Sequence, residues 1–183
     1  MGTSSKQVKG VETVSNRNDA ENRVRLENLM KQYGTDLLRL CTMHLRDPEL
    51  ARDAVQETFL KVYRAMDQYR GEASEKTYLT SIAMNVCRDM LKSAWFRHRS
   101  PVALDQLPEE ASDFQMPDDT VLSEVMRLPL KYREVVLLRF YQDLKLGEIA
   151  EVLGISVGKV RSHLSSASGI LREKLKEWVT HEA

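Results

Sequence analysis

The chain has 183 residues, of which 42% are hydrophobic and 30% charged, a composition typical of a soluble globular protein. Its 27 basic and 27 acidic residues cancel, so no strong net charge points to a partner. No stretch approaches the roughly 18 uninterrupted apolar residues of a membrane span, and the polar segment from Met1 to Asn22 lacks the apolar core of a signal peptide. We therefore expect a cytoplasmic protein without membrane insertion.

The predicted fold class is all-α, because apolar residues recur at helical spacing from Asn22 onward and strand-favouring runs are scarce. Residues 1–22 are rich in Ser, Asn, Thr and charge, and are predicted to form a disordered tail. Asp47-Pro48 predicts a helix start, since Asp caps free amides and Pro suits the first helical position. After an expected loop over 67–73, Ser74 should cap a helix that ends near Trp95.

The charge is segregated along the chain. Residues 23–99 carry 14 basic and 10 acidic residues, residues 100–124 carry no basic and 7 acidic ones, and residues 125–183 carry 10 basic and 7 acidic ones. Three prolines and no helical period between 100 and 119 indicate a linker. The predicted organisation is a helical domain over 23–96, an acidic flexible linker over 97–117 and a second helical domain over 118–183, each domain with its own core.

The second domain contains the pattern of a helix-turn-helix between Leu144 and Ala167. Gly154 can adopt the left-handed turn between two helices, and Ser156 can cap the second one. The second helix would present side chains suited to major-groove and phosphate contacts, namely Lys159, Arg161, Ser162, His163, Ser165 and Ser166. The same spacing occurs in helical hairpins that only pack, so the pattern alone leaves both interpretations open.

Two longer motifs resemble a known family. Residues 128–156 read LPLKYREVVLLRFYQDLKLGEIAEVLGIS and resemble region 4 of the extracytoplasmic-function (ECF) group of the sigma-70 family. Residues 53–91 read DAVQETFLKVYRAMDQYRGEASEKTYLTSIAMNVCRDML and resemble region 2. The resemblance implies a sigma factor: a protein without enzymatic activity or cofactor that binds core RNA polymerase and directs it to promoter DNA at a stress- or envelope-responsive regulon. It also implies an anti-sigma partner and no small-molecule substrate.

The resemblance assigns polymerase docking to the helix around Asp53–Tyr63. The positions concerned are Asp53, Gln56, Glu57, Thr58, Phe59 and Tyr63. Gln and Glu offer directional hydrogen bonds beside an apolar anchor, which suits an interface. Charge alone does not decide between this role and a solvated helix face with Thr58 and Phe59 in the core, and the motif favours docking.

The resemblance assigns reading of the promoter −10 element to the loop 69–74 and the helix after it. A flipped base is held by stacking and by hydrogen bonds to its edge. Candidates for these contacts are Tyr69, Arg70, Lys76, Tyr78, Asn85 and Arg88. Tyr78 lies on the apolar stripe and is expected in the core, whereas Asn85 lies on the polar side and is the best candidate for a base contact.

The expected −35 contacts are Lys159, Arg161, Ser162, Ser165 and Ser166, and here the chain departs from the family. Relatives usually carry further arginines where this chain has His163-Leu164-Ser165-Ser166-Ala167-Ser168. Fewer phosphate contacts weaken binding and its salt dependence, so we expect weak −35 binding or an unusual target sequence.

Other features leave alternatives. The acidic linker either occupies a basic polymerase channel, as the family implies, or is a solvated tether. Cys41-x-x-His44 has the residue types of a metal pair, but no second pair follows and Cys41 lies on an apolar stripe, so a core cysteine is favoured over a zinc site.

A stand-alone helix-turn-helix regulator and a decoy that kept the fold but lost DNA binding are the rival functions, and no catalytic motif supports an enzyme.

Overall fold

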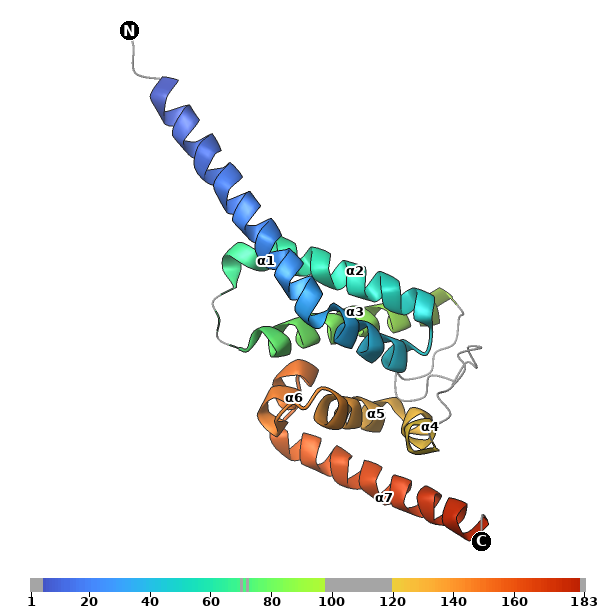
Figure 1. Ribbon diagram of the computed structural model, residues 1–183. Coiled ribbons are helices and arrows are strands. Elements are labelled where there is room, and N and C mark those ends of the chain that lie inside the picture. The colour runs from blue at the N-terminus through green and yellow to red at the C-terminus, as the bar shows by residue number, and fades with distance from the viewer. Residues whose placement is uncertain (1–4, 70, 72, 98–119, 182–183) are drawn as a thin grey trace.

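The computed structural model describes residues 5–69, 71, 73–97 and 120–181, with side chains for residues 19–69, 71, 73–93 and 121–176. Every regular element in these ranges is helical (Figure 1), which confirms the all-α prediction. The first helical unit comprises α1 (Ser5–Leu45), α2 (Pro48–Ala65), the 3-10 turn η1 (Met66–Gln68) and α3 (Glu75–Arg97). The second comprises α4 (Thr120–Arg127), α5 (Leu130–Val136), the π-helical turn η3 (Leu137–Tyr141), α6 (Leu146–Leu153) and α7 (Val157–His181).

Local capping signals set the helix starts of the first unit. Asp47 accepts hydrogen bonds from the amides of Glu49 (2.9 Å) and Leu50 (3.0 Å), and Pro48 is the first residue of α2, as predicted. Ser74 accepts from the amide of Thr77 at 3.1 Å at the start of α3, which confirms the second predicted cap. The three helices enclose a core of buried residues that includes Leu37, Cys41, Phe59, Leu79 and Val86.

Helix α1 differs from the expectation of a disordered tail over 1–22, because it is helical from Ser5. Residues 5–45 contain no proline, and a helix seeded by a packed segment extends at little cost through residues such as Lys, Gln, Glu and Ala. Figure 1 shows the first half of α1 projecting away from the other helices. Its described side chains are held by an ion pair between Arg23 and Asp19 (2.9 Å) and by a hydrogen bond that the Tyr63 hydroxyl donates to Asp19.

The second unit has the predicted helix-turn-helix. Gly154 ends α6 with φ 65° and ψ 34°, the left-handed conformation that glycine adopts without a steric penalty. Ser156 accepts from the amide of Lys159 at 3.2 Å and caps α7. Val160 and Ala167 are fully buried, which seats α7 on the rest of the unit. The predicted start of the second domain at residue 118 and the acidic linker lie outside the described residues.

The two units pack against each other. The first unit has a core of its own, as expected, but the core of the second unit also includes residues of the first. Leu40 and Met43 of α1 and Met84 of α3 belong to the same buried apolar cluster as Met126, Val135 and other residues of the second unit. In Figure 1, α5 and α6 lie directly beneath the first unit. Apolar periodicity identifies which residues are buried but not which of two cores they enter.

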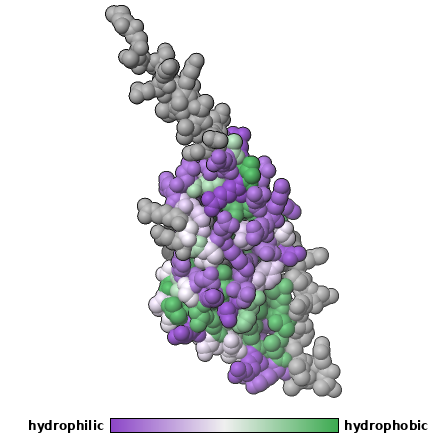
Figure 2. Space-filling model, turned by 60° about the vertical axis from the view of Figure 1, so that its left-hand side comes forward, coloured by the Kyte–Doolittle hydropathy of each residue, from purple (hydrophilic) through white to green (hydrophobic). Residues whose placement is uncertain are grey.

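The surface is mostly hydrophilic on the face that Figure 2 presents, with apolar patches toward the end of the molecule that holds the second unit. The large apolar side chains that this unit exposes include Phe140 and Tyr141 of the π turn, with 73% and 41% of their surface accessible. Within the described ranges, no helix combines the length and hydrophobicity needed to span a bilayer.

Candidate functional site

An apolar groove of about 420 Å³ runs between α1 and α2. Both helices contribute its lining, which consists of Leu26, Met30, Gly34, Leu38, Arg52, Val55, Gln56, Phe59 and Leu60. Met30 and Leu60 expose 48% and 43% of their surface, so the groove presents apolar side chains to the solvent. Gln56 and Arg52 add polar groups to this lining. An apolar groove with polar groups in its lining suits an amphipathic helix.

The predicted docking residues divide into surface and core positions. Asp53 and Gln56 are exposed, and Glu57 is partly exposed with Lys61 4.0 Å away. Phe59 is 4% exposed yet lines the groove. Thr58 is fully buried, and its hydroxyl donates to the carbonyl of Ala54 at 2.6 Å. A buried hydroxyl that is already bonded to the helix has no surface for a partner, so Thr58 supports the helix rather than the interface.

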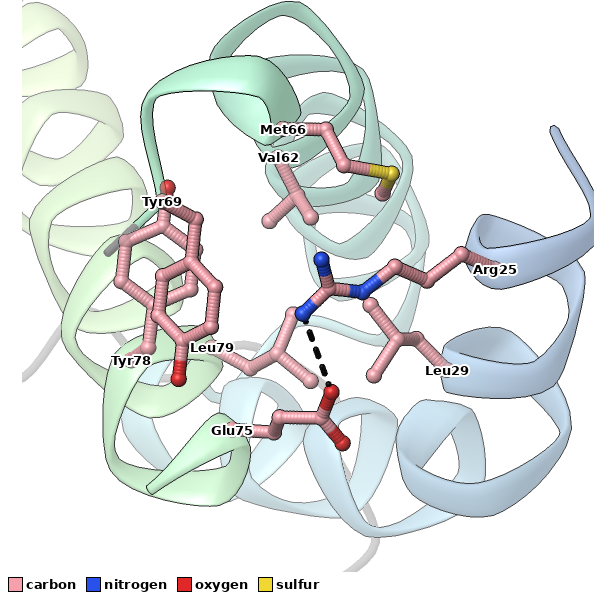
Figure 3. Close-up of a pocket in the computed structure, with 8 residues that line it drawn as sticks. All are labelled: Arg25, Leu29, Val62, Met66, Tyr69, Glu75, Tyr78 and Leu79. Atoms are coloured by element: carbon pink, nitrogen blue, oxygen red, sulfur yellow. Dashed lines mark hydrogen bonds and ion pairs between the residues drawn. The ribbon is translucent and has the colours of Figure 1, made fainter. Parts of the chain in front are cut away.

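The aromatic pair of the predicted −10 site is already packed. The rings of Tyr69 and Tyr78 lie 4.6 Å apart at 41°, and the Arg25 guanidinium lies 5.3 Å from the centre of the Tyr69 ring (Figure 3). Arg25 also pairs with Glu75 at 3.2 Å. The Tyr69 hydroxyl donates to the carbonyl of Ala73, and burial, then the charge of Glu75, raises the pKa of Tyr69.

The pocket around these rings holds about 10 Å³, enough for one water and not for a base. A base could therefore enter only if the loop moved. Arg70, another −10 candidate, lies outside the described residues.

The remaining −10 candidates lie along α3 in different environments. Asn85 is exposed, as predicted. Lys76 is half-buried, and Arg88 exposes only 22% of its side chain. Arg88 pairs with a carboxylate of the second unit, that of Glu134, at 2.9 Å.

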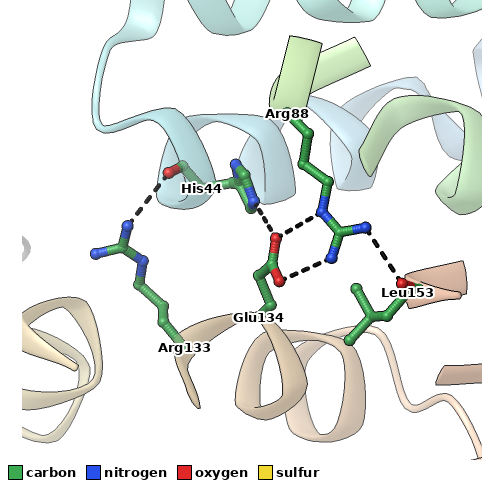
Figure 4. A network of polar contacts seen from close by, with 5 residues as sticks. All are labelled: His44, Arg88, Arg133, Glu134 and Leu153. Carbon is green, nitrogen blue, oxygen red and sulfur yellow. Dashed lines mark hydrogen bonds and ion pairs between the residues drawn. The ribbon is translucent and has the colours of Figure 1, made fainter. Parts of the chain in front are cut away.

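Arg88 is held in a polar network between the units (Figure 4). Its Nε and one terminal nitrogen donate to the two oxygens of Glu134 on α5 at 3.0 and 2.9 Å, and its other terminal nitrogen lies 3.4 Å from the carbonyl oxygen of Leu153. His44, at the end of α1, donates from Nε2 to Glu134 at 2.9 Å. The carboxylate thus joins three helices of the fold.

Glu134 is ionised in this setting. Burial by itself would raise its pKa, but the hydrogen bonds from His44 and Arg88 and their positive charge outweigh burial and lower the pKa to about 2. Since a carboxylate only accepts hydrogen bonds, Nε2 of His44 is the donor in this contact. The adjacent Arg133 donates to the carbonyls of Met126 (2.8 Å) and His44 (3.5 Å).

A second polar contact between the units involves Glu148 at the start of α6. Its carboxylate accepts from the Lys145 amide at 2.8 Å, and from the hydroxyl of Thr77 on α3 at 2.9 Å. The bond from the Lys145 amide, followed by that from Thr77 and by the nearby charges of Lys145 and Lys76, lowers the pKa of Glu148. Lys76 therefore lies within the electrostatic reach of Glu148.

The predicted −35 residues occupy the outer side of α7. Lys159, Arg161, Ser162 and Ser165 are exposed, and Ser166 is half-buried. Arg161, Ser162 and Ser165 follow the helical repeat and share one face. His163 is half-buried instead of facing outward, and its ring makes an edge contact with Tyr132 with centres 5.6 Å apart.

The cysteines have no sign of a reactive or metal-binding role. Cys41 and Cys87 are both buried, and the hydrogen bond to Cys41, together with burial, raises the pKa of the Cys87 thiol far above neutral pH. Among the residues whose positions are described, no group of three or more His, Cys, Asp or Glu side chains could hold a metal ion. His44, the other half of the motif, instead contacts Glu134.

Comparison with known proteins identifies the two helical units. Residues 29–97 match the family model for Sigma-70 region 2, and residues 119–168 match that for Sigma-70, region 4. Sigma factor SigV of Bacillus subtilis is 30% identical over 152 residues, which are 82% of this chain and 90% of SigV. An ECF RNA polymerase sigma-E factor of Salmonella typhimurium is 32% identical over 142 residues, 68% of this chain and 73% of that protein.

A solved structure shares the fold. The sigma factor RpoE in complex with the anti-sigma factor NepR from Bartonella quintana superposes with a TM-score of 0.63 at 19% identity, over 82% of this chain and 98% of that one. The two family models together cover more than half of the chain, in the order expected of a promoter-specificity subunit. The chain belongs to the ECF group of the sigma-70 family and is a sigma factor, a regulatory protein of transcription initiation.

Proposed function

We propose that the groove between α1 and α2 is the surface on which this sigma factor docks to a helix of core RNA polymerase. The observation that best supports this proposal is the partly exposed apolar lining of the groove around Met30 and Leu60, which also includes Gln56. Asp53 and Glu57 flank it on α2 and supply negative charge. The partner helix would insert apolar side chains beside Phe59 and pair its polar groups with Gln56 and Glu57.

The −10 element would be read from α3 and the loop before it. Asn85 is exposed on α3, where its amide can pair with a base edge, and Tyr69 and Tyr78 supply stacking surface once the loop moves. Arg88 and Lys76 would contact phosphates, and Arg70, which lies outside the described residues, remains a further candidate. The −35 element would be read by Arg161, Ser162 and Ser165, with Lys159 and Ser166 at the sides of that face.

Two variants separate docking from promoter reading. Gln56→Ala combined with Glu57→Ala should abolish co-purification with core polymerase, because polar contacts in an interface cost roughly 1–3 kcal/mol each when removed. Asn85→Ala should keep polymerase binding and lose transcription from the cognate promoter. Asp89→Ala, on an exposed site of α3, is the control and should change neither. Wild-type recovery of polymerase by the double variant would show that α2 is not the docking helix.

The wider setting follows from the relatives. The Bartonella quintana sigma factor was solved with an anti-sigma factor, and an anti-sigma factor is the partner expected to hold the present chain inactive. Its regulon would then respond to stress or to the cell envelope, and the chain would work in the cytoplasm with polymerase. The exposed basic residues of α7 favour this function over a decoy that no longer binds DNA. A stand-alone helix-turn-helix regulator would leave the first unit and its groove without a role.

The functional boundaries of the chain remain a prediction. They divide it into residues 1–22, 23–96, 97–117 and 118–183. Limited proteolysis of the free protein tests it. Cleavage confined to 97–117 would support the linker.

A further inference from the structure

Arg25 of α1 contacts both ends of the loop 69–74, although no sequence motif assigns it a role. Its guanidinium lies 5.3 Å from the centre of the ring of Tyr69, the residue at which the loop begins. It also pairs at 3.2 Å with Glu75, the first residue of α3. In Figure 3 the Arg25 side chain extends from α1 across the pocket toward Glu75, with the two tyrosine rings on the opposite side. One cation therefore joins the start of the loop to its end.

A second side chain of α1 supports the same connection. Asn22 lies about one helical turn before Arg25, and its amide donates to a carboxylate oxygen of Asp67 at 2.8 Å. Asp67 belongs to η1, the turn that leads into Tyr69. Asn22 and Arg25 both precede residue 29, where the match to Sigma-70 region 2 begins. The contact between α1 and the loop is thus made by residues of α1 outside the matched segment.

Arg25 is partly shielded from solvent. It lines the small pocket together with four buried apolar side chains, those of Leu29, Val62, Met66 and Leu79. Arg25 and Glu75 each still expose 41% of their side chains. A cation in such a setting attracts an aromatic face and a carboxylate, but an ion pair this exposed contributes little to the stability of the fold. The contact can therefore orient Tyr69 without the fold depending on it.

The other contacts of Tyr69 come from the loop region itself. Its ring packs on Tyr78 with centres 4.6 Å apart, and its hydroxyl donates to the carbonyl of Ala73 at 2.6 Å. Both contacts would change if the loop moved to admit a base. Arg25 instead belongs to α1, which is anchored in the core of the first unit by Leu29 and other residues. Arg25 therefore gives the Tyr69 ring an attachment that does not depend on the loop.

We propose that Arg25 is a positioning residue for promoter reading, which holds Tyr69 against α1 so that the ring is ready to stack with a base of the −10 element. Binding costs less when the stacking surface is already ordered. A fixed ring also discriminates between bases, since it favours a base whose edge meets its hydrogen-bonding partners from that one position. This inference rests on the proposed reading of the −10 element by α3 and the loop before it.

Fluorine NMR of the full chain tests the contact without polymerase or DNA. The chain has six tyrosines, each of which reports when replaced by 3-fluorotyrosine, and Tyr69→Phe identifies the signal of Tyr69. Arg25→Gln should move that signal toward the position of free 3-fluorotyrosine, because the ring loses its cation. Arg25→Lys retains a cation and should move the signal less. A Tyr69 signal that is unchanged in Arg25→Gln would overturn the proposal.

Arg23→Gln is the matched control. It makes the same substitution two residues earlier on α1, where Arg23 pairs with Asp19 at 2.9 Å and interacts with Tyr63. It should move the signal of Tyr63 and leave that of Tyr69 in place. Circular dichroism verifies that each variant is helical. An equal movement of the Tyr69 signal in Arg23→Gln and Arg25→Gln would count against Arg25, because any loss of charge on α1 would then have the same effect.

Base preference at the −10 element distinguishes positioning from a structural role. Core polymerase with each variant transcribes the cognate promoter and a series of promoters in which every −10 base is replaced in turn. Arg25→Gln should lower the ratio of transcription between the best and the worst base by about tenfold, which corresponds to about 1.4 kcal/mol. Arg25→Lys should recover most of that ratio, and Arg23→Gln should keep it. A wild-type ratio in Arg25→Gln, or a ratio in Arg25→Lys as low as in Arg25→Gln, would contradict positioning by a cation.

Tyr69→Ala separates this inference from the proposed function. If Tyr69→Ala lowers the ratio and Arg25→Gln does not, the loop reads the −10 element and only the role of Arg25 is wrong. If Tyr69→Ala leaves the ratio unchanged, the assignment of −10 reading to this loop is wrong, and the promoter role of Arg25 falls with it. The NMR result for the free protein stands in either case.

Discussion

Glu134 shows how the role of a single residue depends on its surroundings. In the sequence it is one acidic residue in a helix of mixed charge, and its partners lie 90 and 46 residues away. In the fold it is the only carboxylate in the described network of His44, Arg88 and Arg133. Removal of Arg88 would leave the buried Glu134 carboxylate with His44 as its remaining partner, which is more costly than the loss of an exposed ion pair.

The lowered pKa of Glu134 predicts a pH dependence of stability. The ordinary carboxyl value is 4.5 and the folded value is about 2, so the stabilisation is complete above about pH 4.5 and is lost as the pH falls through about 2. The full shift corresponds to about 3 kcal/mol in the free energy of unfolding. We expect Glu134→Gln to unfold more easily than wild type at neutral pH, and the difference to shrink as the pH approaches 2. The groups that contact this carboxylate are His44 of α1 and Arg88 of α3.

Urea unfolding followed by circular dichroism at a series of pH values measures this difference. Glu151→Gln is the reference, since that side chain is exposed. A stability difference between wild type and Glu134→Gln that stays constant down to pH 2 would contradict a carboxylate stabilised by its partners.

At the scale of the element, α7 carries the clearest departure from the family. Its exposed face has one arginine near the start, Arg161, followed by Ser162 and Ser165. Serine can bond a phosphate or a base but brings no charge, so the helix forms few counterion-releasing contacts. The geometry of the helix-turn-helix is intact, and only its side chains are unusual.

This predicts the outcome of changing Arg161 and Ser165. Arg161→Ala should weaken binding to a −35 duplex by roughly 1–3 kcal/mol if the side chain reaches a base. Ser165→Arg, on the same exposed face, should strengthen binding and steepen its salt dependence by about 0.9 for one added phosphate contact. Arg172→Ala is the control. It removes an arginine about two turns beyond Ser165 on α7 and should change binding less than Arg161→Ala does. Fluorescence anisotropy across a salt series measures the binding of each variant to the −35 duplex. Superimposable curves for all the variants would mean that α7 does not enter a groove of the DNA.

The elements that sequence patterns predicted well are those with local causes. The caps at Asp47, Ser74 and Ser156 and the turn at Gly154 each involve residues within a few positions, and all four have the predicted geometry. The extension of α1 to Ser5 was missed, because a polar segment without an apolar stripe gives no signal of helix. Asn85 and Arg161 were placed correctly on exposed faces, since helical periodicity separates polar from apolar sides.

The part of the site that could not be predicted is the contact between the units. Arg88 was assigned to DNA and Glu134 to no site, because one sequence does not reveal which distant charges meet. The only local hint was His44, an isolated histidine on an otherwise apolar helix end, and its pairing with Cys41 suggested a metal instead. Thr58 shows the converse: the family motif includes it, but its burial makes it a support for α2.

At the scale of the whole molecule, the two units share apolar packing as well as polar contacts. Three side chains of α1 and α3 are buried among residues of the second unit: Leu40, Met43 and Met84. Other side chains of the same two helices are buried in the core of the first unit, among them Leu37, Cys41 and Val86. Each of α1 and α3 therefore has two buried sides. We expect the free protein to unfold in one transition, because separating the units exposes apolar surface of both.

Truncating Met84 should divide this transition. Met84→Ala removes a side chain that is 1% exposed, and Met→Ala substitutions in cores cost roughly 2–5 kcal/mol. Because the lost contacts are those between the units, the second unit should melt apart from the first in differential scanning calorimetry. Met90→Ala is the control: Met90 packs against the core of the first unit, so its loss should lower the melting temperature of that unit without separating the two. A single cooperative transition in Met84→Ala, shifted as far as that of Met90→Ala, would show that the units are not coupled through this cluster.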